Sequence, residues 1–194
     1  MKAHPEYLQS HLLMFDAAKR DRPDVLALAI ALGFPLEVQD RTGKRALHEA
    51  AVNNALNAAH FLVERGAEID ARESSYDATP IGWASHGDHD GMVDYLSTRS
   101  RDISTLCFRG CVDRVREILA GDPGLARVVN RDGCTPLWFL PDDEAKAWQI
   151  IELLLAAGAE PSVKNKAGGT AADWARRRGM LDIAARLGHG GESA

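Results

Sequence analysis

Apolar residues recur along the chain in short helical clusters, and the clusters repeat with a period of 33 to 35 residues. Aligning the segments that open an apolar run places Met14, Leu47, Ile81, Leu137 and Ala172 in register. The step from Ile81 to Leu137 is 56 residues, too long for one repeat. A degenerate copy, DISTLCFRGCVDRVREIL, lies inside this step. It places Ile103 in register, 34 residues before Leu137. A fixed period of this length is the signature of a repeat architecture, and we count six units.

Each unit follows one local pattern of a turn, a short helix, a tight break and a second amphipathic helix. In the second unit, Leu47 and Ala50 share one helical face, Ala58 and Leu62 share the next, and Gly66 ends the pair. The pattern predicts an all-α solenoid of about six helix-turn-helix repeats with short β-turn fingers, one repeat lacking its finger. We expect one domain, 1–194, with repeats at approximately 11–38, 39–71, 72–98, 99–126, 127–163 and 164–188.

Two Thr-Pro pairs mark sharp helix starts. Proline is favoured at the first helical position, and a preceding threonine can cap the free amides. Thr79-Pro80 and Thr135-Pro136 therefore predict the first helices of the third and fifth units. The fourth unit has no such turn, because STRSRD links its helix directly to the preceding one, and we expect a notch in the row of fingers there.

These motifs resemble the ankyrin repeat family. The matching residues are Leu47-His48-Glu49-Ala50-Ala51, Thr79-Pro80-Ile81-Gly82-Trp83-Ala84, Thr135-Pro136-Leu137-Trp138 and the helix exits Arg65-Gly66-Ala67 and Ala157-Gly158-Ala159. The likeness extends over about residues 11–188. It departs from the family pattern at Arg45-Ala46, which replaces Thr-Pro, and at about two extra residues around PDDEAKA. The resemblance implies a binding surface on the concave face, formed by fingers and first helices.

Composition and charge narrow the class of protein. Of the 194 residues, 45 % are hydrophobic and 26 % are charged, which is ordinary for a folded globular chain. The net charge of −5 gives no reason to expect nucleic acid as a partner. No apolar run is long enough for a membrane span, and the first residues do not form an export signal. Three cysteines fit a reducing compartment, so we expect a cytoplasmic protein. The polar ends MKAHPEYLQS and GHGGESA lead us to expect a complete array.

The histidine-rich segment YDATPIGWASHGDHDG raises the question of a metal or acid/base site. In register, Asp88-His89 falls at the break between two helices, where a histidine bonded to backbone is the plainer interpretation. Ligands on one helix face would be four residues apart, whereas His86 and His89 are three apart. The alternative function is a metal-dependent protein or enzyme that uses His86, Asp88, His89 and Asp90.

Other candidates for chemistry have plainer structural roles. Cys107, Cys111 and Cys134 form no C-x-x-C pair and are expected to pack as small apolar residues. We interpret His48 as a first-turn hydrogen-bonding residue rather than a general base. The triplet at 176–178 is interpreted as a solvated cap rather than a phosphate site. We therefore predict no catalytic residues, no metal ligands and no cofactor.

The remaining hypothesis is a non-catalytic module that binds a protein partner. Aromatic residues and arginine dominate binding hot spots because they bury a large area with few rotatable bonds. Phe108-Arg109, beside Tyr76 and His86, is the predicted centre. Trp83, Trp138 and Phe139 are included, with packing between repeats as their alternative role. The full set of predicted binding residues is Lys44, Tyr76, Trp83, His86, Phe108, Arg109, Trp138 and Phe139. The partner is an unidentified protein, with no nucleic acid and no membrane, and the pattern specifies no oligomeric state.

Overall fold

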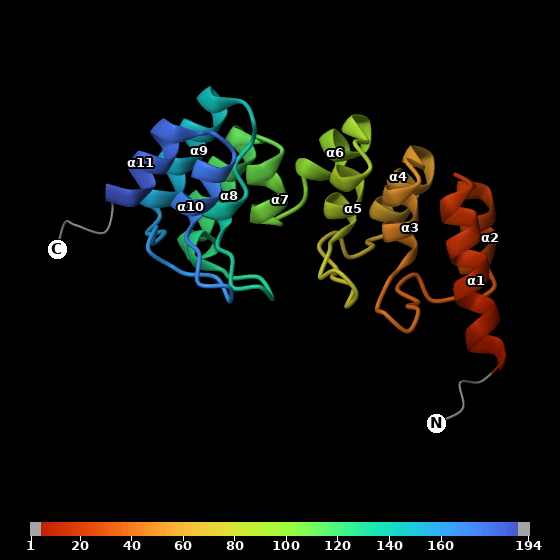
Figure 1. The fold of residues 1–194 in the computed structure, drawn as a ribbon. Helices are drawn as coiled ribbons and strands as arrows, with labels where there is room; N and C mark the ends of the chain where they lie inside the picture. Colours follow the sequence, from red (N-terminus) through yellow and green to blue (C-terminus); the bar gives the residue numbers. More distant parts are fainter. Residues whose placement is uncertain (1–4, 190–194) are drawn as a thin grey trace. The chain divides into compact units, whose positions relative to one another are not determined.

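The computed structural model describes residues 5–189, in which every regular element is helical and no β-strand occurs. The chain divides into two compact units, 1–102 and 103–194. Within each unit the helices follow one another in antiparallel pairs (Figure 1). The prediction of an all-α ankyrin-type solenoid is confirmed, while the number of repeats and their boundaries stay predictions.

Unit 1 consists of three helix pairs. Their bounds are α1 Pro5–Lys19, α2 Pro23–Ala31, α3 Ala46–Val52, α4 Leu56–Glu64, α5 Pro80–His86 and α6 Asp90–Ser97. The first helices α1, α3 and α5 pack against one another in series, and α2 packs on α4. Ala18, Ala50 and Ala84 are fully buried where these helices meet. Small side chains at these contacts allow the helix axes to approach closely.

Unit 2 continues the pairing with one irregularity. Its elements are α7 Ile103–Phe108, α8 Val112–Gly121, η1 Pro123–Arg127, η2 Pro136–Trp138, α9 Glu144–Ala156, α10 Ala171–Arg177 and α11 Leu181–His189. The full first helix expected after Thr135 is wrong, because only the single 3-10 turn η2 forms and Thr135 makes no cap bond. Pro141 explains this, since proline cannot continue a helix and disfavours helical geometry at Leu140. Asp143 then caps α9 through the Lys146 N–H, at 3.0 Å.

The tight breaks between paired helices use one backbone geometry. Asp21, Asn54 and Asp88 each have a positive φ, between 51° and 55°, and lie 33 and 34 residues apart. Asn and Asp tolerate this left-handed conformation better than other residues with a side chain. Asp88 in the histidine-rich segment therefore occupies a recurring structural position.

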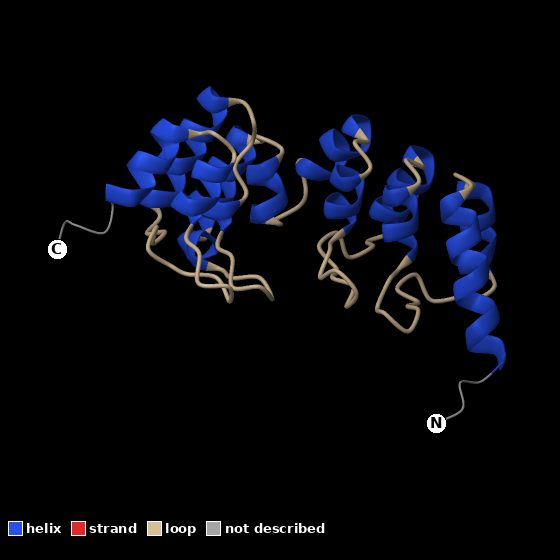
Figure 2. Cartoon of the chain, viewed as in Figure 1, coloured by secondary structure: helices blue, strands red, loops and turns tan. Residues whose placement is uncertain are grey.

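The fingers are closed by a second recurring motif (Figure 2). At the base of each finger, the side-chain oxygens of one residue accept backbone N–H groups from across the turn. These residues are Asp40, Glu73, Asn130 and Asn165. The motif satisfies backbone groups that have no partner in a helix or sheet. It therefore fixes the conformation of the side chains carried by each finger.

A network of polar side chains holds the segment 98–102, which replaces a finger in the fourth repeat. Thr79 Oγ1 donates to the buried Asp102 carboxylate at 2.7 Å, and Arg72 contacts the same carboxylate at 3.4 Å. Ser100 Oγ and the Arg101 backbone N–H both donate to Asp70, at 2.5 and 2.8 Å. The direct link expected from STRSRD is thus present and is anchored on Asp70, Arg72 and Thr79.

Candidate functional site

The histidine-rich segment forms part of the scaffold. His89 Nε2 lies 3.1 Å from the carbonyl oxygen of Val52 at the end of α3, so its ring bonds to the backbone of the preceding repeat. This confirms the role predicted for His89. His86 is the exposed last residue of α5, and His89 lies three residues further on, beyond the helix end. Across the described residues, no group of three or more His, Cys, Asp or Glu side chains could hold a metal ion.

His48 and Cys134 also have structural environments. His48 is fully buried, and its Nδ1 accepts the Arg45 backbone N–H at 3.2 Å, as expected of a first-turn residue. Burial lowers the pKa of His48. Burial raises the pKa of the Cys134 thiol, which disfavours the nucleophilic thiolate. Cys107 is buried in α7.

Four of the predicted binding residues come together in unit 1. The rings of Tyr76 and Trp83 meet edge to face at 5.4 Å between centroids, and Trp83 meets His86 in the same manner at 6.2 Å. Lys44 Nζ, from the preceding finger, lies 5.4 Å from the centre of the Trp83 ring. With Ala78 and Gly82 the three aromatic residues line a hollow of about 290 Å³. We call Lys44, Tyr76, Trp83 and His86 the unit 1 cluster.

The backbone that carries the unit 1 cluster is fixed by hydrogen bonds, whereas its Tyr76 side chain is exposed to solvent. Glu73 accepts the Tyr76 backbone N–H at 2.9 Å, which fixes the finger, while the Tyr76 side chain is 68 % exposed. Glu49 pairs with Lys44 at 2.6 Å and keeps the ammonium group beside Trp83. The Trp83 indole N–H is buried, and no side chain or backbone group in the described part of the chain accepts it. An exposed ring on a rigid support is the arrangement found at interface hot spots.

A larger groove lies in unit 2, between the fingers at 130–134 and 165–169 and the helix α10. Its volume is about 860 Å³. Phe108, Trp138 and Phe139, all predicted from the sequence, line it together with Trp174, Arg177 and Lys166. We call this the unit 2 groove. Trp138 is only 6 % exposed, which favours its alternative packing role, although one side of it faces the groove.

Trp174 is the residue that sequence reasoning missed. Its side chain is 39 % exposed, its ring centroid lies 6.4 Å from that of Trp138, and the Arg177 guanidinium lies 5.6 Å from its centre. A signal was available, because Trp174 follows Ala172 by two residues just as Trp83 follows Ile81 and Phe139 follows Leu137. The same register position thus carries an aromatic residue in three repeats.

The predicted centre at Phe108-Arg109 lies at the start of unit 2. Phe108 ends α7 and is 45 % exposed, and Arg109 directly follows it, half-buried. Tyr76 and His86 belong to unit 1. A joint site of these four residues stays a prediction.

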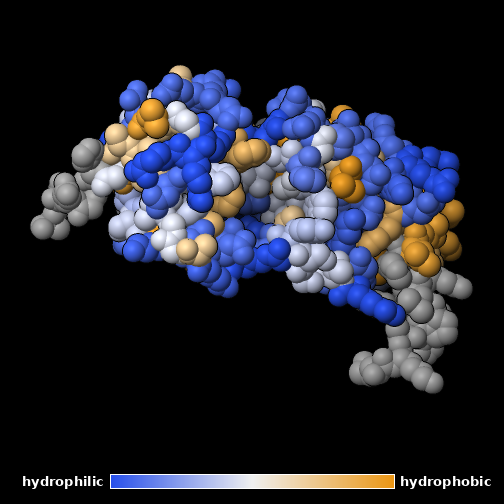
Figure 3. All heavy atoms as spheres, viewed as in Figure 1, coloured by the Kyte–Doolittle hydropathy of each residue, from blue (hydrophilic) through white to orange (hydrophobic). Residues whose placement is uncertain are grey.

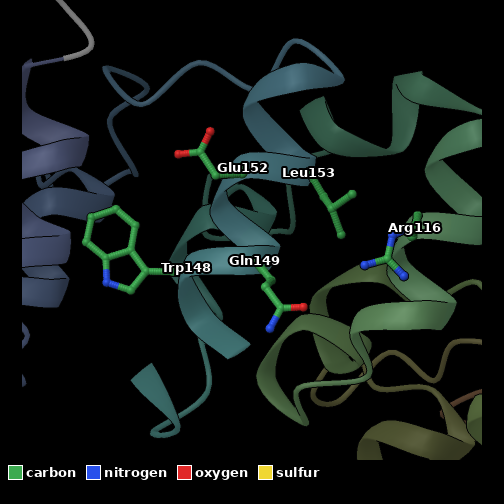
Figure 4. A pocket seen from close by; sticks show the side chains of 5 residues that line it. All are labelled: Arg116, Trp148, Gln149, Glu152 and Leu153. Atoms are coloured by element: carbon green, nitrogen blue, oxygen red, sulfur yellow. The ribbon is translucent and has the colours of Figure 1, made fainter. Parts of the chain in front are cut away.

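One further hollow contains none of the predicted residues. Arg116 on α8 and Trp148, Gln149, Glu152 and Leu153 on α9 line about 410 Å³ on the second helices of unit 2. Figure 4 shows Gln149 and Leu153 on the side of α9 toward Arg116, whereas Trp148 projects from the opposite side. Arg116 pairs with Asp113, and Glu152 contacts Arg186 at 3.3 Å. The two charged side chains that line this hollow are therefore paired within the protein.

Some large apolar side chains are exposed outside the unit 1 cluster and the unit 2 groove. Polar residues cover most of the visible face in Figure 3. Of the described side chains, the exposed large apolar ones elsewhere are Leu12, Leu13, Leu28, Leu32, Val128, Val129 and Leu181. In the part of the chain that the structure describes, no helix has the length and apolar character needed to cross a membrane.

Paired helices, stacked first helices and hydrogen-bonded fingers define a helical repeat protein. The family model for ankyrin repeats, in three copies, matches residues 13–107. The Escherichia coli (strain K12) protein YahD, an ankyrin repeat protein by name, is 27 % identical over 185 residues, covering 88 % of this chain and 92 % of YahD. Residues 13–107 therefore match ankyrin repeats, and ankyrin repeats generally serve as protein-protein interaction modules.

Two further relatives share only a segment with this chain. Human palmitoyltransferase ZDHHC17 is 28 % identical over 82 residues, which is 42 % of this chain and 13 % of the relative. Palmitoyltransferase Hip14 from Drosophila melanogaster is 30 % identical over 100 residues, or 50 % of this chain and 16 % of the relative. Each match therefore covers only a small part of the palmitoyltransferase.

Proposed function

We propose that this chain binds a partner protein through its fingers and first helices and performs no chemistry of its own. The observation that carries the proposal is the unit 1 cluster, where a 68 % exposed tyrosine stands edge-on to Trp83 at 5.4 Å on a hydrogen-bonded finger. Such a ring can be covered by a partner without the loss of much conformational freedom. The unit 2 groove, with Phe108 and Phe139, supplies a second aromatic surface of the same kind.

The environments of the titratable side chains support the proposal that the chain catalyses no reaction. His48 and His89 both contact backbone groups, and the Cys134 thiol has a raised pKa. The alternative metal-dependent function would need His89 to leave the Val52 carbonyl. Elemental analysis of the purified protein tests it, and we expect no stoichiometric zinc, iron or calcium. We also propose a cytoplasmic location, because three cysteines, an odd number, fit a reducing compartment better than a disulfide framework.

A matched pair of tyrosine variants tests the binding surface. Tyr76→Ala removes the exposed ring from the finger, and Tyr95→Ala removes a tyrosine that stacks on His60 at 3.8 Å on the second helices of the same unit. Immobilised wild type and variants are compared for partner capture from a cell extract by quantitative mass spectrometry. We expect a partner protein that is retained by wild type and by Tyr95→Ala. The amount of that partner captured by Tyr76→Ala should be lower by at least about tenfold. Equal capture by Tyr76→Ala, with unchanged melting temperature, would reject the unit 1 cluster as the site.

A further inference from the structure

The unit 2 groove combines an aromatic lining with an excess of positive charge. Among its charged residues, Arg178 pairs with Asp142 and donates to the Leu140 carbonyl at 2.7 Å, so these two charges offset each other. Lys166 and Arg177 then face a single remaining carboxylate, Asp132. The groove is locally cationic in a chain whose net charge is −5.

An unsatisfied donor lies in the same lining. Trp138 is only 6 % exposed, and its indole N–H has no acceptor among the described residues. A buried N–H without a partner costs free energy. Because this N–H is itself closed off, Trp138 contributes its ring, and not its donor, to the lining of the groove.

The aromatic side chains define the rest of the ligand. Trp174 is 39 % exposed and Phe108 is 45 % exposed, and both line the groove beside Trp138. Rings of this kind bind planar or branched apolar side chains by offset or edge contacts. At about 860 Å³ the groove is roughly three times larger than the hollow of the unit 1 cluster. That space exceeds what a lone carboxylate would fill.

We propose that the unit 2 groove binds an acidic peptide segment of the partner, in which an aromatic or large apolar side chain lies next to Asp or Glu. The carboxylate pairs with Lys166 and Arg177, and the apolar side chain lies against Trp174 and Phe108. This inference rests on the proposed function, because it takes the occupant to be a protein.

Three capped pentapeptides test the chemistry: acetyl-Gly-Asp-Phe-Asp-Gly-amide, its Asn counterpart and its Lys counterpart. Binding is followed by tryptophan fluorescence and by titration calorimetry on the whole chain. We expect the Asp peptide to bind at least about tenfold more tightly than the Asn peptide, with the Lys peptide weakest, and the difference to shrink with salt. Equal binding of the Asp and Asn peptides would overturn the inference.

Neighbouring arginines on α10 provide a matched control. Arg177→Gln removes a groove cation, whereas Arg176→Gln removes the same charge one residue away, from a side chain that pairs with Asp173 at 2.9 Å and does not line the groove. We expect Arg177→Gln and Lys166→Gln each to weaken the Asp peptide about fivefold to tenfold, and Arg176→Gln to leave it within about twofold. Equal losses for Arg176→Gln and Arg177→Gln would also overturn the inference.

Partner capture separates this inference from the proposed function. If none of the peptides binds but Tyr76→Ala still abolishes capture, the acidic-peptide assignment fails and the interaction module stands. If neither Tyr76→Ala nor Arg177→Gln changes capture and no peptide binds, both fail. Melting temperatures within about 2 °C of wild type are required of each variant, so that a folding defect is not counted as a binding defect.

Discussion

The ring of His89 bonds to the carbonyl oxygen of Val52, at 3.1 Å, and thereby joins the break of the third repeat to the first helix of the second. The ring reaches this carbonyl by folding over Gly87. A Cβ built on Gly87 would lie 2.6 Å from His89 Nε2, closer than real contacts allow. The absence of a side chain at Gly87 and the position of the His89 ring are therefore physically linked.

A double-mutant cycle tests this link. Gly87→Ala should displace the ring and remove its bond to Val52, destabilising the protein by about 1 kcal/mol. In a His89→Ala background the same change should be neutral or stabilising, because Gly87 has a helical φ of −86° and alanine is then favoured. Urea unfolding of the four proteins gives the coupling energy. Additive effects within about 0.3 kcal/mol would contradict the linkage.

Periodicity alone predicts most of this fold, because it reports which faces are buried. The side chains that the sequence places in register are at most 2 % exposed at Met14, Leu47, Ile81 and Leu137. The failure at 136–141 is local: Thr135-Pro136 is a good helix start, but Pro141 limits the helix to one turn. Trp174 lies far along the sequence from the missing finger, and the signal that indicates it is the register position that it shares with Trp83 and Phe139. No sequence pattern indicates that the Trp138 and Trp83 N–H groups lack acceptors, since that depends on tertiary packing.

The Thr79 hydroxyl has two roles that Thr135 lacks. Thr79 Oγ1 accepts the Gly82 N–H at 3.2 Å and donates to the buried Asp102 carboxylate at 2.7 Å. Thr79→Val keeps the shape but removes both bonds, and we expect a loss of about 2 to 3 kcal/mol in the free energy of unfolding. Thr135→Val is the matched control at the equivalent position, where no cap bond exists, and should cost less than about 1 kcal/mol. Chemical denaturation of both variants checks the difference, and equal losses would exclude the Asp102 network as its cause.

His48 should make stability depend on pH near neutrality. Burial holds the pKa of His48 below its ordinary value of 6.5 in the folded state. As the pH falls below about 6.5 the unfolded chain takes up a proton that the folded chain does not, so stability decreases. His48→Gln should remove this part of the dependence. Unfolding free energies at pH 7.5, 6.5, 6.0 and 5.5 measure the slope, and a slope identical in wild type and variant would contradict the assignment.

Glu73 couples the acid stability of unit 1 to the presentation of Tyr76. Burial alone would raise its pKa, but the backbone N–H groups of Tyr76, Ser75 and Ala78 outweigh burial and hold the pKa below its ordinary value of 4.5. A depressed carboxyl pKa contributes stability that is complete above about pH 4.5 and is lost as the pH falls through the folded value.

Glu73→Gln mimics the protonated state at neutral pH. We expect it to lower the free energy of unfolding by about 1 to 2 kcal/mol at pH 7 and by much less at pH 3, where wild type has lost the same contribution. Because the finger then holds Tyr76 less firmly, partner capture should fall although the ring is still present. Glu64→Gln, an exposed carboxylate at the end of α4, is the control for loss of charge. A Glu73→Gln protein with wild-type capture and a wild-type pH profile would show that the finger keeps its conformation without this carboxylate.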